Sequence, residues 1–432
     1  MRCHSVKQLV LIATITLSSA QYQSLSGYQV WALNGDIPNV SIHLLKNGLA
    51  DILDFAGPRK QISIHPKNLE EVDRILNQEG IHHRVLIEDL AVYLESRDVL
   101  RKKRQTETCS LASCPKPLSE SFMTFEEMCC KKSCNNIPPQ MEWYLINLNA
   151  TYYPRVEVTS IGKSIEGRNI WQVFIKSSAC NEGTAIWLEG GIHAREWISP
   201  AVTLHLVNRL ARDCSIGKLF DVYIVPMANP DGYEYTWNTN RLWRKNRRII
   251  PDSDCDGVDL NRNWDFDYGV GASDAYCSEI YKGVSAFSEP ETLSLKTAME
   301  AVNQEKNLIL VIALHSYGQY LLYPYGGRTE SAPFTTEMIE KGKVFTRAVS
   351  HSHETVFRID NSGVAYSQAS GATDDWAKGV LGVKYVYTLE LRDGGSEGFV
   401  LGVDKIAPSE EEIWEGMRAI LLSVNPSNYT LL

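Results

Sequence analysis

From residue 138 onward the hydrophobic and polar positions alternate between two patterns. Unbroken runs of apolar, often β-branched residues recur at 170–175, 185–188, 222–225, 308–314 and 383–389. Stretches with the apolar spacing of a helix separate them, at 141–153, 200–212 and 290–303. Strands that are apolar on both faces and are joined by helices are typical of a covered α/β sheet. We therefore predict one α/β domain over residues 138–425.

Residues 21–104 follow a different pattern. Strand-like runs at 28–32, 61–65 and 83–87 alternate with helical spacing at 40–49 and 68–78, which predicts a small α+β unit. This unit has no cysteine and no evident cluster of catalytic side chains. It ends in the basic run 101–104, which predicts cleavage by a protease specific for basic sites rather than a merely solvated patch of charge.

The first 20 residues have the pattern of a secretory signal peptide. Arg2 and Lys7 flank the start, residues 9–17 are apolar, and residues 18–20 are small, as a cleavage site requires. A retained anchor is the alternative, but the apolar stretch is short for a bilayer and no later stretch is longer. We expect a secreted, extracellular protein without a membrane partner.

Cysteine usage fits that compartment, because disulfides persist outside the cell. Of ten cysteines, Cys3 would leave with the signal peptide, and five of the remaining nine crowd into the segment 105–137. We expect this segment to be a disulfide-linked insert or linker. Because nine is an odd number, one cysteine has no partner within the chain. Sequons at Asn39, Asn149 and Asn428 are candidate glycosylation sites. The net charge of −9 argues against nucleic acid as a partner.

The chemistry is concentrated where the apolar runs end. His193 and Glu196 follow the run 185–188, His315 ends the run 308–314, and Glu390 ends the run 383–389. Carboxyl ends of strands in α/β sheets are where ligand sites form. Three protein ligands with an open fourth position are typical of a catalytic zinc. We predict zinc at His193, Glu196 and His315, with Glu390 as the general base beside it.

Two loop segments supply cationic and amide groups. The segment 240–248 is basic with a tryptophan inside, and 259–264 combines Asp259 with Asn261 and Arg262. The simplest interpretation is a solvated basic loop. Arginine beside asparagine is, however, a donor pair suited to a carboxylate.

Six motifs together resemble the pancreatic-type (A/B) zinc carboxypeptidases, in that family's order and approximate spacing. The motifs are His193-Ala-Arg-Glu-Trp, Asn229-Pro-Asp-Gly-Tyr, Trp243-Arg-Lys-Asn-Arg, Val258-Asp-Leu-Asn-Arg-Asn-Trp, His315-Ser-Tyr and Thr388-Leu-Glu-Leu-Arg-Asp. The resemblance covers 138–425 and implies a mixed eight-stranded twisted sheet flanked by helices. Residues 21–104 resemble the family's inhibitory activation domain. A secreted zymogen is therefore implied, with peptide or protein substrates that have a free C-terminus.

The resemblance also implies roles for single residues. Asp259 would fix the tautomer of His193, Glu390 would take the proton of the attacking water, and Arg247 would stabilise the tetrahedral oxyanion. Asn261 and Arg262 would hold the terminal carboxylate of the substrate, which is what an exopeptidase requires. The matching positions that remain are subsite walls and a disulfide: Arg195, Tyr317, Phe399, and Cys255 with Cys277.

Substrate preference depends on the segment 366–376. Asp374 occupies the position that sets specificity in this family, where an acid pairs with a C-terminal Lys or Arg; the alternative is a carboxylate that only caps the loop. The family's mobile active-site tyrosine aligns with Ser367, one residue after Tyr366. Either a local shift of the backbone lets Tyr366 take that role, or the site lacks this group; Tyr366 is our candidate for it.

Three alternatives stay open at this point. The preference could be for apolar C-terminal residues, as in A-type members. The chain could be a catalytically impaired binding protein on the same scaffold, although all four metal-site and base residues are present. The main role of the protein could also lie in residues 105–137, acting as a module that adheres to matrix or a receptor.

Overall fold

The computed structural model describes residues 22–34, 38–54, 60–95, 140–177, 183–213, 216, 219–328, 330–353, 355–365, 368–395 and 397–425. The predicted signal peptide, the basic run 101–104 and the cysteine-rich segment lie outside the described residues. So do Tyr366, Ser367 and Asn428. Within the described residues, no helix combines the length and the apolar composition needed to cross a membrane.

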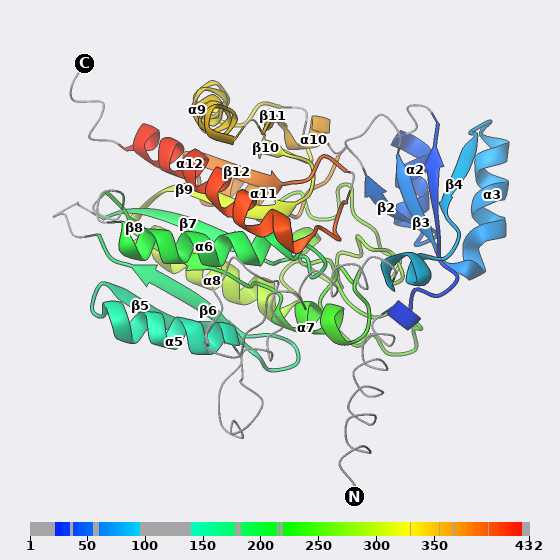
Figure 1. Cartoon of the computed structure of the whole chain (residues 1–432), viewed down its shortest axis with the longest axis horizontal. Helices are drawn as coiled ribbons and strands as arrows, with labels where there is room; N and C mark the ends of the chain where they lie inside the picture. Colours follow the sequence, from blue (N-terminus) through cyan, green and yellow to red (C-terminus); the bar gives the residue numbers. More distant parts are fainter. Residues whose placement is uncertain are drawn as a thin grey trace, which may run out of the picture.

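A mixed eight-stranded sheet forms the larger part of the molecule, as predicted (Figure 1). Its order is β11-β10-β12-β9-β7-β8-β6-β5, and β12, β9, β7 and β8 run parallel to one another. The strands are β5 (Val156–Lys163), β6 (Asn169–Ile175), β7 (Thr184–Gly190), β8 (Asp221–Val225), β9 (Asn307–Ser316), β10 (Tyr320–Tyr323), β11 (Arg358–Asn361) and β12 (Tyr385–Leu391). All five strands predicted in this region are present; β5, β10 and β11 are too polar or too short to be recognised from their pattern.

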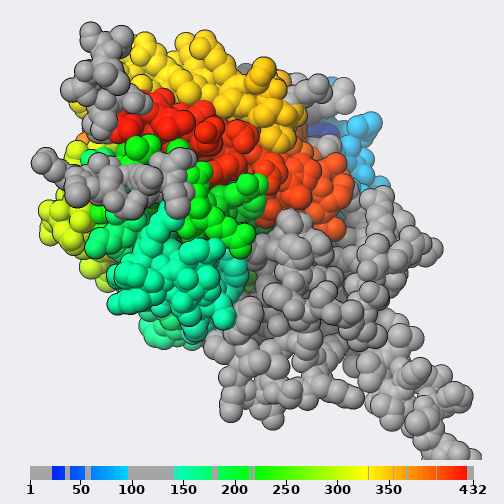
Figure 2. Space-filling model, turned by 60° about the vertical axis from the view of Figure 1, so that its left-hand side comes forward, coloured from blue at the N-terminus to red at the C-terminus, as the bar shows by residue number. Residues whose placement is uncertain are grey.

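Helices cover both faces of this sheet, which explains the unbroken apolar runs. Along β7, Ile186 and Leu188 pack into one core, whereas Ala185 and Trp187 pack into the other. Helices α6, α9 and α12 lie on the first side and α8 and α11 on the second; Figure 2 shows α12 crossing the molecule between α9 and α6. The helices are α5 (Gln140–Tyr152), α6 (Ile198–Arg212), α7 (Pro230–Asn238), α8 (Pro290–Glu305), α9 (Thr335–His353), α10 (Ser362–Ala365), α11 (Thr373–Gly379) and α12 (Ile406–Val424).

The small N-terminal unit is an antiparallel sheet of order β2-β3-β1-β4 with helices beside it (Figure 1). Its elements are β1 (Gln29–Leu33), α2 (Pro38–Lys46), β2 (Asp51–Asp54), β3 (Gln61–Ile64), α3 (Leu69–Gln78) and β4 (His83–Ile87). It has its own core, which Ile280 of the large unit joins. The predicted α+β unit is therefore present, and it is docked on the large sheet domain.

Candidate active site

The parallel strands bring the predicted metal ligands together. In the order β12-β9-β7, Glu390 is paired in register with His315, and the turn that follows β7 carries His193 and Glu196. All three predicted ligands are buried. The carboxyl ends of these strands thus bring together residues that are about 200 positions apart in the sequence.

The ligand atoms converge on one position. His193 Nδ1 lies 2.8 Å from Glu196 Oε1, and His315 Nδ1 lies 3.2 Å from Glu196 Oε2 and 3.1 Å from His193 Nδ1. Two imidazole nitrogens and a carboxylate within 4.8 Å of one another are a donor set that fits zinc. Among the described residues, this is the one group of such side chains close enough to hold a metal ion.

Asp259 sets which nitrogen of His193 faces the cluster. Its Oδ1 lies 3.1 Å from His193 Nε2, so Nε2–H donates to the carboxylate and the lone pair of Nδ1 is left for a metal. Burial and the Arg244 guanidinium lower the pKa of His193, against the pull of Glu196 and Asp259. The neutral form that a ligand requires is therefore favoured.

The cluster attracts positive charge at its other histidine. Burial disfavours the charged form of His315, but the Glu196 carboxylate, with a smaller contribution from Glu390, outweighs burial and raises the pKa of His315 to about 9. The two histidines conversely lower the pKa of Glu196 despite its burial. A proton and a metal ion compete for the same Nδ1 of His315, so this is a place where a cation is stabilised.

Glu390 borders the cluster from β12. Burial raises the pKa of Glu390 to about 8, with Glu196 and Asp374 adding to the shift and His315 and Arg244 opposing it. A carboxylate with a raised pKa is a stronger base than an exposed one, which suits proton transfer near neutral pH.

The guanidinium beside the cluster belongs to Arg244, not to Arg247. Arg244 Nη1 lies 3.8 Å from Glu196 Oε1, and Arg244 Nη2 and Nε donate to Asp259 at 3.0 and 3.2 Å. The Arg247 guanidinium instead lies 3.6 Å from the ring centre of Tyr235 and 3.9 Å from Asp256. The sequence could not distinguish the two arginines, because the segment is a loop and no periodicity predicts which way its side chains face.

The proposed carboxylate clamp lies on the short 3₁₀ turn Leu260–Arg262. Asn261 Oδ1 accepts a hydrogen bond from the Thr373 N–H (3.1 Å). The amino group of the same side chain therefore points away from Thr373, where it can donate to a substrate. Arg262 is anchored through Nη1 to the Asn261 carbonyl at 2.8 Å, and its buried Nε has no partner among the described residues. Both residues thus retain donor capacity for a carboxylate.

Asp374 is buried at the start of α11. Its Oδ2 accepts from the hydroxyls of Thr388 (3.0 Å) and Ser362 (3.3 Å), and its Oδ1 accepts from the Asp375 N–H. The neighbouring Asp375 is protonated more readily than usual, because burial and the charge of Asp374 raise its pKa to about 8.

Three predicted subsite residues meet the small N-terminal unit. Arg195 forms an ion pair with Asp51 of β2, and the Tyr317 hydroxyl donates to the Leu53 carbonyl. Phe399 lies against both, with its ring centre 4.9 Å from that of Tyr317 and 4.3 Å from the Arg195 guanidinium carbon. Nothing in the sequence singles out Asp51, because an acidic residue at the start of a short strand is ordinary.

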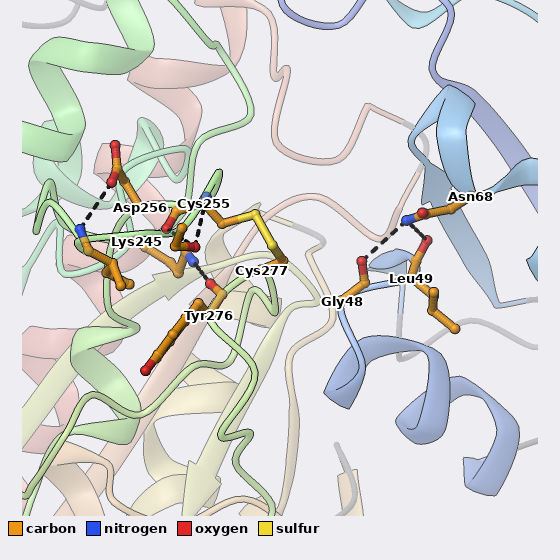
Figure 3. Close-up of a disulfide and its surroundings, with 10 residues drawn as sticks. Gly48, Leu49, Asn68, Lys245, Cys255, Asp256, Tyr276 and Cys277 are labelled. Carbon is orange, nitrogen blue, oxygen red and sulfur yellow. Dashed lines mark hydrogen bonds between the residues drawn. A yellow bond between two sulfur atoms is a disulfide. The ribbon is translucent and has the colours of Figure 1, made fainter.

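The predicted disulfide is present. Cys255 and Cys277 are bonded and close a loop of separation 22, which faces the Gly48–Leu49 turn of the small unit (Figure 3). Gly48 has φ of +65°, and a Cβ there would lie 2.8 Å from the backbone carbon of Cys277.

Residues 141–416 match the model of the family described as zinc carboxypeptidase. The chain belongs to the zinc carboxypeptidase family. It is 33% identical over 371 residues to mouse carboxypeptidase A4, covering 84% of this chain and 83% of that protein. It is 34% identical over 382 residues to zinc carboxypeptidase A 1 of Anopheles gambiae, covering 86% and 82%.

Solved structures agree with the sequence relatives. The carboxypeptidase A from Helicoverpa armigera has a TM-score of 0.79 at 26% identity, over 93% of this chain and 99% of that one. Thrombin activatable fibrinolysis inhibitor has a TM-score of 0.74 at 27% identity, with the same coverage. This carboxypeptidase is accordingly a metalloenzyme, and zinc is the cofactor that its three buried ligands fit.

Proposed function

We propose that this protein is a secreted zymogen that removes C-terminal Lys or Arg from peptides and proteins. The zinc carboxypeptidase family gives the reaction class. The observation that carries the specificity is the buried carboxylate of Asp374, held by three donors at the start of α11. A buried acid favours a cationic side chain as its occupant.

The residues divide the reaction between them. Zinc, when bound, supplies a Lewis acid that lowers the pKa of water and polarises the scissile carbonyl. Glu390 would accept the proton of the attacking water and return it to the leaving amine. Arg244 replaces Arg247 as our candidate for stabilising the oxyanion, because Asp259 fixes its guanidinium beside Glu196.

The clamp determines where the chain is cut. Asn261 and Arg262 would bind the free carboxylate of the substrate, which places the last peptide bond next to Glu390 and the metal ligands. Asp374 would then receive the side chain of the last residue. Tyr366, outside the described residues, remains our candidate for the capping tyrosine.

The zymogen proposal is supported by the contacts of β2. Asp51 and Leu53 hold Arg195 and Tyr317, which are the groups that would bind a substrate upstream of its last residue. Cleavage at 101–104 by an activating basic-site protease would let the small unit leave. Secretion, the signal peptide 1–20, glycosylation and the role of 105–137 as a linker are parts of the same proposal.

A peptide panel tests the proposal directly. Blocked peptides that end in Lys, Arg, Phe or Leu are assayed before and after limited proteolysis at the basic run, with and without a chelator and added zinc. We expect zinc-dependent release of Lys and Arg after proteolysis. A preference for Phe would contradict the specificity, and equal activity before proteolysis would contradict the zymogen.

The D374I variant, which replaces the acid with a larger, uncharged and apolar side chain, sharpens the test. Loss of the cation's partner is expected to lower kcat/KM for the Arg peptide by roughly 10- to 100-fold. Activity on the Phe peptide should rise or stay level. If D374I loses activity on both peptides equally, Asp374 only caps its loop. The A-type alternative predicts that wild type already prefers Phe.

A further inference from the structure

One buried acid near the site has no part in the reaction described above. Glu189 lies on β7, the central strand that leads to His193, and is 1% exposed. Its Oε2 accepts from Trp187 Nε1 at 3.0 Å, but Oε1 has no partner among the described residues. An acid buried in the middle of a sheet is costly, so its place requires an explanation.

The sheet register shows what Glu189 faces. Ala313 of β9 is paired with Glu189 on one side and with Thr388 of β12 on the other. Thr388 in turn donates to Asp374. Glu189, Ala313 and Thr388 form one row across the three strands. This row lies two residues before the row in which His315 and Glu390 are paired, and therefore on the same face of the sheet. Helix α11 packs on β9 and β12, and Ala313 places only a methyl group between Glu189 and Thr388.

Thr373, the first residue of α11, lies beside Glu189. Its hydroxyl is close enough to the Glu189 carboxyl group to lower the pKa of that acid, against the larger opposite effect of burial. Thr373 Oγ1, like Glu189 Oε1, is buried and completes no hydrogen bond among the described residues. Two unpaired polar atoms that face each other point to a direct or water-bridged link between them.

Thr373 connects to both substrate-binding groups. Its N–H donates to Asn261 Oδ1 and so decides which way the Asn261 amide faces. It also precedes Asp374 in the chain. A shift of Thr373 would therefore disturb the carboxylate clamp and the specificity residue together.

We propose that Glu189 is a positioning residue for substrate binding, which supports Thr373 from below and thereby holds Asn261 and Asp374 in place. The proposal rests on the proposed function, because it gives Asn261 and Asp374 their substrate roles. The link needs a hydrogen-bonding group rather than a charge, since burial raises the pKa of Glu189 toward the neutral acid.

Two substitutions separate hydrogen bonding from packing. E189L fills the site with an apolar side chain of similar length but removes the hydrogen-bonding group that faces Thr373. We expect it to raise KM for the Arg peptide roughly 5- to 50-fold with little change in kcat. E189Q can still accept from Trp187 and donate to Thr373, so it should stay near the wild-type KM. T373V should raise KM as E189L does, and E189L should add little in the T373V background.

Glu410 provides the matched control. It is also buried, has one unpaired oxygen among the described residues, and pairs with His205 at 3.2 Å between α12 and α6. E410L should lower the midpoint of thermal unfolding but leave KM unchanged.

The outcomes are distinguishable from a failure of the proposed function. Activated wild type is assayed first, and if it does not release Arg or Lys, the proposed function itself is wrong. If it does and E189L leaves KM unchanged, or changes KM only as far as E410L does, Glu189 is merely structural. Additive effects of E189L and T373V would likewise overturn the link through Thr373.

Discussion

At the scale of single residues, the chemistry of the site depends on which nitrogen, oxygen or guanidinium faces the metal-ligand cluster. Asp259 illustrates this, because one carboxylate fixes both the tautomer of His193 and the place of Arg244. The sequence contains each of these residues within recognisable motifs. It does not contain the directions in which they point.

The two arginines of the segment 240–248 give a direct comparison. R244A should lower kcat by roughly 100- to 1,000-fold, as expected when an oxyanion donor is removed, with a smaller effect on KM. R247A should lower kcat only a few-fold, because its guanidinium packs on Tyr235 and Trp243. Steady-state kinetics of both activated variants decide between them, and a larger loss in R247A would return the role to that residue.

Glu291 makes a pH-dependent contribution to stability. Burial raises the pKa of Glu291 to about 7 from an ordinary 4.5, so the folded chain holds its proton more tightly than the unfolded one. Its stabilising contribution is complete below pH 4.5 and is lost as pH rises through 7, amounting to about 3 kcal/mol at most. E291Q should remove this part of the slope. The measurement is the free energy of unfolding of both proteins from pH 4 to pH 8; parallel curves would contradict the expectation.

At the scale of elements, β12, β9 and β7 do the positioning. Their parallel register brings Glu390, His315 and His193 to the same end of the sheet. Because side chains alternate between the two faces along each strand, one set is buried under α6 and α12 and the other under α8 and α11. The apolar runs predicted β7, β8, β9 and β12 well, because strands covered on both faces carry no polar interruptions. The short strands β10 and β11 and the helices α9 and α12 had no comparable pattern in the sequence.

The loop that carries the clamp is held by the Cys255–Cys277 disulfide. A bridge over a separation of 22 residues contributes about 3 kcal/mol through the entropy of the unfolded chain. The C255S/C277S double variant should lose stability of this order and show a raised KM, because Asn261 and Arg262 lie within the closed loop. Chemical unfolding and kinetics measure the two effects; unchanged KM would separate the disulfide from the clamp.

At the scale of the whole molecule, the decisive contact is between the small unit and the large one. Ser278 Oγ donates to the Leu45 carbonyl at 2.6 Å, and Ile280 joins the small unit's core. Together with the Asp51–Arg195 pair, these contacts hold β2 on the subsite residues. In the proposed zymogen, inhibition would therefore come from this docking, with no change in the metal ligands.

Docking can be weakened without touching the site. G48A places a methyl group 2.8 Å from the Cys277 backbone and should raise the activity of the uncleaved chain. G80A is the matched control, because Gly80 has a similar φ of +70° but open space around its Cβ position. Activity of uncleaved wild type, G48A and G80A is compared at equal protein concentration, and equal values for G48A and G80A would contradict the docking mechanism.

Apolar runs and motifs in the sequence were enough to predict the fold class and the zinc ligands, because these depend on patterns and residue types that have few other uses. The carboxylate clamp rests on the same motifs and remains a proposal. Only the folded structure shows which arginine faces the cluster, that Asp51 forms an ion pair with Arg195, and that Glu189 lies beside Thr373. These facts depend on loop direction, on the docking of two units and on the register between strands far apart in the chain. Such geometry follows from long-range packing, which leaves no periodic trace in the order of residues.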